Sequence, residues 1–212
     1  MLFRSSGKST LLNLIPRFID VTDGKVLLDG VDVRDQTLES VWSELGLVPQ
    51  RSFLFGGTVA QNLRYGKSDA TDEELWKALD IAQAKDFIEE LPEKLEARVA
   101  QGGTNFSGGQ RQRLSIARAL VKEPQILIFD DSFSALDYTT DSKLRSALQD
   151  AMAHTTMIVV AQRVSTILNA DQIIVLDQGR VVGIGAHTDL MQSCETYQEI
   201  VLSQLSPEEA AS

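Results

Sequence analysis

Near its N-terminus the chain carries a tetrapeptide whose residue types could bind phosphate: Gly7, Lys8, Ser9 and Thr10. In the pattern G-x-x-x-x-G-K-[ST], backbone N–H groups converge on phosphates, lysine neutralises their charge, and serine or threonine ligates Mg²⁺. Leu2 stands where the first glycine of that pattern belongs, and no strand pattern precedes the loop. On its own, the tetrapeptide is therefore equally compatible with an ordinary helix start.

An apolar run that ends in two acids lies much further along the chain. Ile126–Phe129 predicts a buried strand, and Asp130 and Asp131 follow it directly. In a phosphate-loop enzyme, the first acid of such a pair holds Mg²⁺ through water, and the next residue positions the attacking water. A buried strand followed by an acidic turn is the ordinary alternative. The phosphate-loop tetrapeptide upstream favours the catalytic interpretation.

Between these two segments lies a glycine-rich helix start with two arginines behind it. Because glycine and serine leave backbone N–H groups open, the N-terminus of this helix could bind an anion. Arg111 and Arg113 add positive charge nearby. A plain turn is the alternative, and the strand ending in Asp130 downstream argues against it. The residues of this helix start are Ser107, Gly108, Gly109 and Gln110.

The composition of the whole chain excludes some partner classes. The 212 residues carry a net charge of −10, whereas nucleic-acid binding needs concentrated Lys and Arg, so we expect no nucleic-acid partner. The single cysteine, Cys194, rules out an internal disulfide and suits a reducing compartment. The longest apolar runs are far shorter than the ~20 residues of a membrane helix. We therefore expect a soluble polypeptide that meets a membrane only through a partner or a further segment.

Hydrophobic periodicity predicts alternating strands and helices, which is typical of an α/β fold with a parallel sheet covered on both faces. Thr71 and Glu74 predict a capping box at one helix start. No strand pattern lies between 53 and 123, so this range predicts a helical subdomain inserted into a core of residues 1–52 and 124–190, followed by a C-terminal helix and tail over 191–212. Strands are expected at 24–29, 46–50, 126–130, 156–161 and 172–177, and helices at 8–18, after Thr71, from 110 and at 141–152.

These segments occur in an order that resembles the nucleotide-binding domain of ABC transporters, particularly the exporter type, from Leu11 to about Ser203. The resemblance implies a P-loop NTPase (RecA-like) parallel-sheet core with an inserted α-helical subdomain, and an N-terminal β-subdomain that is missing here. It also implies a head-to-tail dimer, in which each ATP lies between two domains. The motifs that carry it are 7–10 (Walker A), Gln50 (Q-loop), 107–110 (signature), 126–130 (Walker B), 134–137 (D-loop) and 159–167 (switch).

The resemblance also implies roles for individual residues. ATP would be bound by Ser6, Gly7, Lys8, Ser9 and Thr10 of one domain and, in trans, by Ser107, Gly108, Gly109 and Gln110 of the other. Mg²⁺ would be held by Ser9, Gln50 and Asp130, and catalysis would be served by Asp131, Gln162 and Gln50. Gln50 would relay the nucleotide state to a transmembrane domain normally fused upstream, at the cytoplasmic face of the cell membrane. Asp137 would couple the two nucleotide sites.

Two positions depart from the family pattern. The family's catalytic glutamate is here Asp131, one methylene shorter, and its switch histidine is here Gln162, which cannot carry a proton as imidazole does. We therefore predict that this chain's own site is slow and that its partner is a different subunit with a hydrolysing site. A regulatory ATP clamp without significant hydrolysis and a slow homodimeric ATPase are the alternatives. DNA-repair ATPases share these motifs, but the acidic composition argues against that class.

The start of the chain also departs from the family pattern. The family places an adenine-stacking aromatic residue and the phosphate-loop strand before the Walker A motif, and the sequence has neither. Loss of an aromatic stack removes roughly 1–3 kcal/mol of binding, and loss of a central strand exposes sheet edges. We therefore expect weak ATP affinity and marginal stability of the isolated polypeptide.

Overall fold

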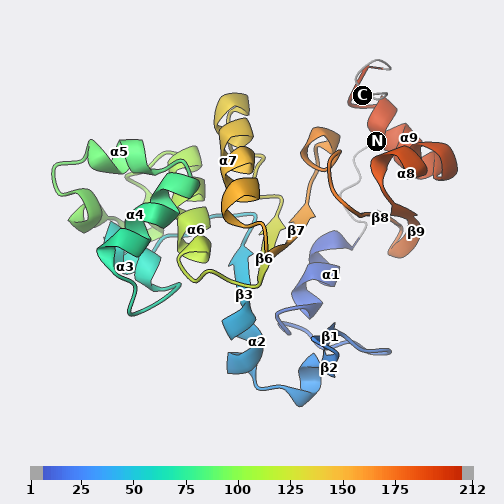
Figure 1. The fold of residues 1–212 in the computed structure, drawn as a ribbon, viewed down its shortest axis with the longest axis horizontal. Coiled ribbons are helices and arrows are strands. Elements are labelled where there is room, and N and C mark those ends of the chain that lie inside the picture. The colour runs from blue at the N-terminus through green and yellow to red at the C-terminus, as the bar shows by residue number, and fades with distance from the viewer. Residues whose placement is uncertain (1–6, 207–212) are drawn as a thin grey trace. The chain divides into compact units, whose positions relative to one another are not determined.

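The computed structural model describes residues 7–206, which divide into two units. One unit runs from Asp35 to Ile158, and the other combines the two ends of the chain, up to Arg34 and from Val159 onward (Figure 1). The subdomain boundaries expected near 53 and 123 fall inside the first unit and stay a prediction.

A parallel sheet forms the centre of the unit from Asp35 to Ile158. Strand β3 (Leu45–Val48) pairs in parallel with β6 (Ile126–Asp130), and β7 (Thr156–Val160) follows in the strand order β3-β6-β7. Gly46 is required in β3, because a Cβ there would lie 2.8 Å from Pro124 Cγ. Leu127 is fully buried, as are its two successors in β6, which is typical of a strand covered on both faces. The expected parallel sheet is therefore confirmed.

Two helices accompany this sheet. Helix α2 (Leu38–Glu44) leads directly into β3, and the side chain of Thr37 caps its N-terminus. Helix α7 (Tyr138–Ala151) is capped by Asp137 and begins three residues before the expected helix. Its buried residues include Leu144 and Leu148, as the periodicity predicts.

The helices between β3 and β6 gather on one side of that strand pair (Figure 1). They are α3 (Val59–Arg64), α4 (Asp72–Ile81), α5 (Lys85–Glu89) and α6 (Gly108–Leu120). The expected capping box of Thr71 and Glu74 is present at the start of α4. The expectation of no strands in this segment is wrong in one detail. Residues Gly57–Thr58 (β4) and Arg98–Val99 (β5) form a short antiparallel pair within this segment.

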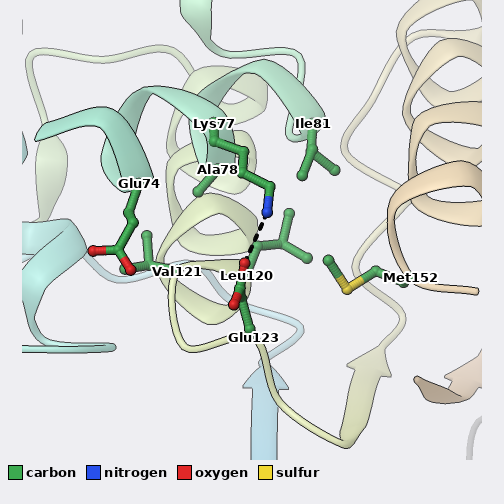
Figure 2. Close-up of a pocket in the computed structure, with 8 residues that line it drawn as sticks. All are labelled: Glu74, Lys77, Ala78, Ile81, Leu120, Val121, Glu123 and Met152. Atoms are coloured by element: carbon green, nitrogen blue, oxygen red, sulfur yellow. Dashed lines mark hydrogen bonds and ion pairs between the residues drawn. The ribbon is translucent and has the colours of Figure 1, made fainter. Parts of the chain in front are cut away.

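A shallow hollow lies at the far end of α6 from its glycine-rich start. Apolar side chains of α4 and α6 line it together with Met152, and the ion pair of Lys77 with Glu123 (2.8 Å) crosses it (Figure 2). Because α6 has 13 residues and a helix rises ~1.5 Å per residue, this hollow lies about 20 Å from Ser107. It is therefore separate from the candidate site described below.

The unit made from the chain ends begins with α1 (Lys8–Leu14) and a hairpin of β1 (Leu27–Leu28) and β2 (Val31–Asp32). The helix expected over 8–18 stops at Leu14, because Pro16 has no N–H to donate to the helix. The strand expected over 24–29 shrinks to two residues. Asp29 and Gly30 both have positive φ, 50° and 80°, and form the tight turn of the hairpin.

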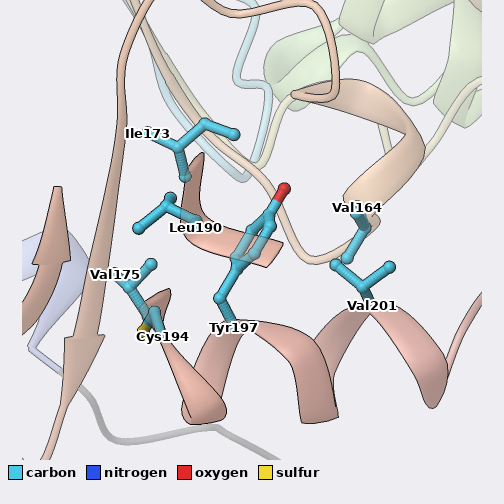
Figure 3. Packing of buried hydrophobic residues seen from close by; sticks show 7 residues of the cluster. All are labelled: Val164, Ile173, Val175, Leu190, Cys194, Tyr197 and Val201. Carbon is cyan, nitrogen blue, oxygen red and sulfur yellow. The ribbon is translucent and has the colours of Figure 1, made fainter. Parts of the chain in front are cut away.

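The same unit ends with a second hairpin and two helices. Strands β8 (Ile173–Asp177) and β9 (Arg180–Gly185) are antiparallel, and α8 (His187–Ser193) and α9 (Glu195–Leu202) follow. Tyr197 of α9 is 2% exposed at the centre of the apolar cluster in Figure 3. The cluster comprises Val164, Ile173, Val175, Leu190, Cys194, Tyr197 and Val201. Among the helices of residues 7–206, none has the length and apolar character needed to cross a bilayer.

Candidate active site

The two acids after the buried strand lie at the carboxyl edge of the parallel pair β3–β6, the edge at which open α/β sheets bind ligands. Asp130 is the last residue of β6 and is half-buried. Asp131 is 7% exposed and has a φ of 49°, a left-handed conformation that is uncommon for a residue with a Cβ. Such conformations persist where the surrounding structure enforces them.

Two serines enforce the turn at Asp131. Ser132 is 1% exposed, and its Oγ donates to the carbonyl of Val48, the last residue of β3, at 2.8 Å. Ser134 Oγ donates to the carbonyl of Asp131 at 2.9 Å. The backbone that carries the Asp131 carboxylate is thereby fixed both to the neighbouring strand and to the following loop.

Gln50 lies close to Asp131 although 81 positions separate them in the sequence. Its Nε2 donates to Asp131 Oδ2 at 3.1 Å. Gln50 comes two residues after the end of β3, so the parallel pairing of β3 with β6 brings both side chains to one edge. The structure thus joins two of the expected catalytic residues, and Asp130 is adjacent to them.

The side chains around this edge include the oxygen donors that Mg²⁺ prefers. Magnesium is bound in proteins by one or two carboxylates together with substrate phosphates and water. The Asp130 carboxylate and the amide oxygen of Gln50 are groups of that kind, and the nitrogen of the same amide is already directed to Asp131. The donor set at this edge therefore fits a magnesium ion.

The glycine-rich helix start has the expected form. Ser107 is the N-cap of α6, its Oγ accepts from the Gln110 backbone at 3.2 Å, and Gln110 Oε1 accepts from the Ser107 backbone at 2.9 Å. This reciprocal capping leaves the N–H groups of Gly108 and Gly109 at the exposed first turn, where the helix dipole favours an anion.

The two arginines behind this helix start face the helical segment. Arg111 Nη1 donates to the carbonyl of Phe106 at 2.6 Å, and Arg113 Nη1 donates to the carbonyl of Gln83 at 2.5 Å. The Arg113 guanidinium also stacks 4.8 Å above the Phe87 ring, and its burial lowers the pKa of that group. Their positive charges lie near the helix start as expected, but both guanidinium groups already donate hydrogen bonds to nearby backbone carbonyls.

Asp137 is exposed and begins α7. Its Oδ1 accepts from the Thr140 backbone at 2.9 Å, and its Oδ2 accepts from Thr140 Oγ1 at 2.7 Å. These two hydrogen bonds, with a smaller contribution from the Arg113 charge, hold the pKa of Asp137 below its usual value. The residue expected to couple two sites is therefore an ionised helix cap.

The phosphate-loop residues belong to the other unit. Gly7 is the N-cap of α1 with a φ of 84°, which only glycine adopts freely, and no side-chain hydrogen bond caps that helix. Lys8 is half-buried, and Ser9 and Thr10 are exposed in the first turn. Ser6, which the sequence also places in the phosphate loop, lies outside the described residues.

Gln162 also belongs to the unit made from the chain ends. It is exposed shortly after β7, and its carbonyl accepts from Gln204 Nε2 at 3.0 Å. The expected site residues therefore fall into two groups. Gly7 to Thr10 and Gln162 are in one unit, and Gln50, Asp130, Asp131, Asp137 and the 107–110 helix start are in the other.

Comparison with known proteins gives a consistent result. Residues 5–134 match the family described as ABC transporter. The chain is 54% identical over 202 residues to an uncharacterized ABC transporter ATP-binding protein of Mycobacterium bovis, covering 94% of this chain and 34% of that protein. It is 44% identical over 192 residues to an ATP-dependent lipid A-core flippase of Desulfotalea psychrophila, covering 91% and 34%.

A solved structure is similar along most of the chain. The structure of a bacterial Atm1-family ABC exporter with ATP bound matches with a TM-score of 0.90 and 41% sequence identity, over 93% of this chain and 34% of that one. The chain thus spans about a third of the length of the proteins that it matches.

Proposed function

The chain belongs to the ABC transporter family, as an ATP-binding domain of the exporter type, and we propose that it binds and hydrolyses ATP to drive export as half of a nucleotide-sandwich dimer. The observation that carries the proposal is the contact of Gln50 with Asp131 beside Asp130, at the carboxyl edge of a parallel strand pair. This edge combines a carboxylate that can position a water molecule, oxygen atoms that can bind a cation, and the polar side chain of Gln50, which can contact both the water and the cation.

Phosphate binding in this proposal belongs to the start of α1. Gly7, Lys8, Ser9 and Thr10, with Ser6 before them, hold the phosphates of ATP, because a helix N-terminus and a lysine favour anions. Ser9, Asp130 and Gln50 hold Mg²⁺, which when bound neutralises charge on the phosphate oxygens. In the dimer, the helix start at Ser107, Gly108, Gly109 and Gln110 of the opposite domain completes the site.

In this proposal, Asp131 positions and activates the attacking water, and hydrolysis at this site is slower than it would be with a glutamate at the same position. Its carboxylate is one methylene shorter than glutamate, and a misplacement of about 1 Å can cost on the order of 10²-fold in rate. Gln162 can donate a hydrogen bond to a phosphate but cannot exchange a proton. The chain's own site is therefore slow, and the chain works with a different subunit whose site turns over faster. The regulatory ATP clamp and the slow homodimer are the competing functions.

The membrane domain of the transporter docks on an aromatic patch at the edge of the helical segment. Phe53, Phe55 and Tyr65 form this patch and are 45%, 40% and 64% exposed. The Phe55 ring lies 5.3 Å from Phe53 and 4.6 Å from Tyr65, so the three rings form one surface. Exposed apolar patches mark contacts with other proteins. The proposed location of the chain is accordingly the cytoplasmic face of the membrane, within the assembled transporter.

Comparison of homodimeric and mixed assemblies tests the proposal. The transporter that carries this domain is reconstituted alone and with a second subunit that has Glu and His at the positions of Asp131 and Gln162. We expect ATP binding in both assemblies and a turnover in the mixed assembly at least tenfold higher. Equal turnover in both refutes the slow site, and binding without any turnover from this chain's own site supports the clamp.

A further inference from the structure

The short stretch that carries Gln162 is held by a side chain from the other end of the same unit. Gln204 comes two residues after the end of α9, and its Oε1 accepts from the Val164 backbone N–H at 2.9 Å. Its Nε2 donates to the Gln162 carbonyl at 3.0 Å. Only one orientation of the amide satisfies both groups, because the reverse orientation would place acceptor against acceptor and donor against donor. One side chain is thus matched to two backbone groups.

The backbone between these two groups is extended, and a short helix follows it. Arg163 has φ −99° and ψ 123°, so the Gln162 carbonyl and the Val164 N–H lie on the same side of the chain, and Gln204 pairs with them as a neighbouring parallel strand would. Val164 begins a 3-10 helix (Val164–Thr166) that has no side-chain hydrogen bond from its N-cap, Arg163. The first N–H groups of a helix have no partner within it. Gln204 supplies this acceptor from 40 positions away.

Both sides of the contact rest on the apolar cluster of Figure 3. Val164 is 3% exposed, and its side chain lies beside that of Val201, which is fully buried (Figure 3). The N–H groups of Gln204 and Leu205 both donate to the Val201 carbonyl, at 3.0 and 2.9 Å. The backbone that carries the Gln204 side chain is therefore fixed to the end of α9.

The contact contributes more to direction than to stability. Gln162 and Gln204 are both exposed, so water could satisfy the Gln162 carbonyl in place of the amide, with a small net change in free energy. A water molecule would leave the stretch from Gln162 to Val164 free to rotate, whereas the two hydrogen bonds to one side chain do not. The position of the Gln162 backbone therefore depends on Gln204.

We propose that Gln204 is a positioning residue for ATP hydrolysis, which holds the backbone of Gln162 so that its side chain can reach the phosphate of bound ATP. The inference rests on the proposed function, in which Gln162 donates a hydrogen bond to a phosphate. Gln204 itself does not touch the nucleotide in this proposal. It acts only through the backbone that it holds, and small displacements at a reacting centre have large effects on rate.

Gln204→Ala in the assembled transporter removes both hydrogen bonds and tests this role. A typical hydrogen bond favours the bonded arrangement by roughly two- to tenfold, so we expect kcat for ATP to fall by roughly three- to thirtyfold. Hydrogen exchange in peptides that cover 159–167, measured by mass spectrometry, should become faster. The double variant of Gln204→Ala with Gln162→Ala should be no slower than Gln162→Ala alone, because Gln204 acts through Gln162.

Two further variants separate positioning from a general loosening of the unit. Gln198→Ala is the matched control, since Gln198 lies on α9 and its Nε2 donates to the Met191 carbonyl at 2.8 Å, away from Gln162. It removes a bond of the same kind and should leave kcat unchanged. Gln204→Glu keeps an acceptor for the Val164 N–H but has no donor for the Gln162 carbonyl, so it should lower kcat as Gln204→Ala does.

Several results would overturn the inference. They are a wild-type kcat in Gln204→Ala or in Gln204→Glu, unchanged hydrogen exchange in Gln204→Ala, and an equal loss of kcat in Gln198→Ala. A double variant that is slower than Gln162→Ala by the full factor of Gln204→Ala would also overturn it. A wild-type rate in Gln162→Ala instead refutes the role proposed for Gln162 in hydrolysis, and the inference with it.

Discussion

Lengthening the carboxylate after β6 is the most direct test of why this site should be slow. Asp131→Glu adds one methylene, which extends the reach of the carboxylate by at most about 1.5 Å, one carbon–carbon bond. The backbone cannot supply this distance in the wild-type chain, because Ser132 ties the turn to Val48 and Ser134 holds the Asp131 carbonyl. The turn is also fixed in a left-handed conformation with a φ of 49°.

The expected gain follows from that fixed geometry. A displacement of about 1 Å at a reacting group costs on the order of 10²-fold, so Asp131→Glu should raise turnover by roughly 10- to 10²-fold. The KM for ATP should hardly change, because an interaction made mainly in the transition state affects kcat. Single-turnover hydrolysis in an assembled dimer whose opposite site is disabled measures the two quantities at this site alone.

The same chemical change one residue earlier is the matched control. Asp130→Glu moves a carboxylate that is proposed to hold Mg²⁺, so it should lower hydrolysis and weaken the dependence on magnesium. A rate for Asp131→Glu equal to that of the wild type would refute the reasoning, since the carboxylate length would then not limit the reaction.

Three further predictions concern stability, coupling and pH. Ser132→Ala leaves the Val48 carbonyl without its buried donor and should lower the free energy of unfolding by ~1–3 kcal/mol, measured by urea denaturation. Tyr65→Ala in the aromatic patch should lower transport per ATP hydrolysed, whereas Tyr138→Ala, at a residue that is 82% exposed, should not; equal effects would exclude the patch as the docking face. The lowered pKa of Asp137 contributes stability above the unfolded value near 3.8, and this is lost as the pH falls through the folded value. Asp137→Asn retains a good helix cap and should therefore flatten the acid side of a plot of melting temperature against pH; an unchanged slope would contradict this.

Local signals predicted several of the elements correctly. The capping box of Thr71 with Glu74, the helix start at Ser107 and the bounds of β6 all follow from residues a few positions apart. Such signals act through backbone hydrogen bonds and caps within one turn, and they are visible in the sequence itself. The tight turn at Asp29 and Gly30 is a local feature as well, although the strands that flank it are only two residues long.

Contacts between distant segments were not predictable in this way. Nothing in the residues around Gln50 indicates that its amide meets Asp131, because the contact depends on the register of β3 against β6. Ser132 was not identified as important for the same reason, since a serine in a loop has no pattern of its own. The pair β4–β5 was missed because two-residue strands are too short to show an alternation of apolar and polar residues.

A substitution that removes the charge of Asp131 distinguishes a slow enzyme from an ATP clamp. A carboxylate near the phosphates of ATP repels them, so a clamp would bind ATP better with a neutral side chain at this position. An enzyme needs the carboxylate in order to position and activate water, although the carboxylate also repels the phosphates of ATP. Asp131→Asn keeps the shape and can still meet Gln50 through its amide oxygen. For a slow enzyme it should abolish hydrolysis and tighten ATP binding, measured by titration in the presence of Mg²⁺. If hydrolysis continues at the wild-type rate in Asp131→Asn, then Asp131 is not the residue that activates water, and turnover must depend on the partner's site.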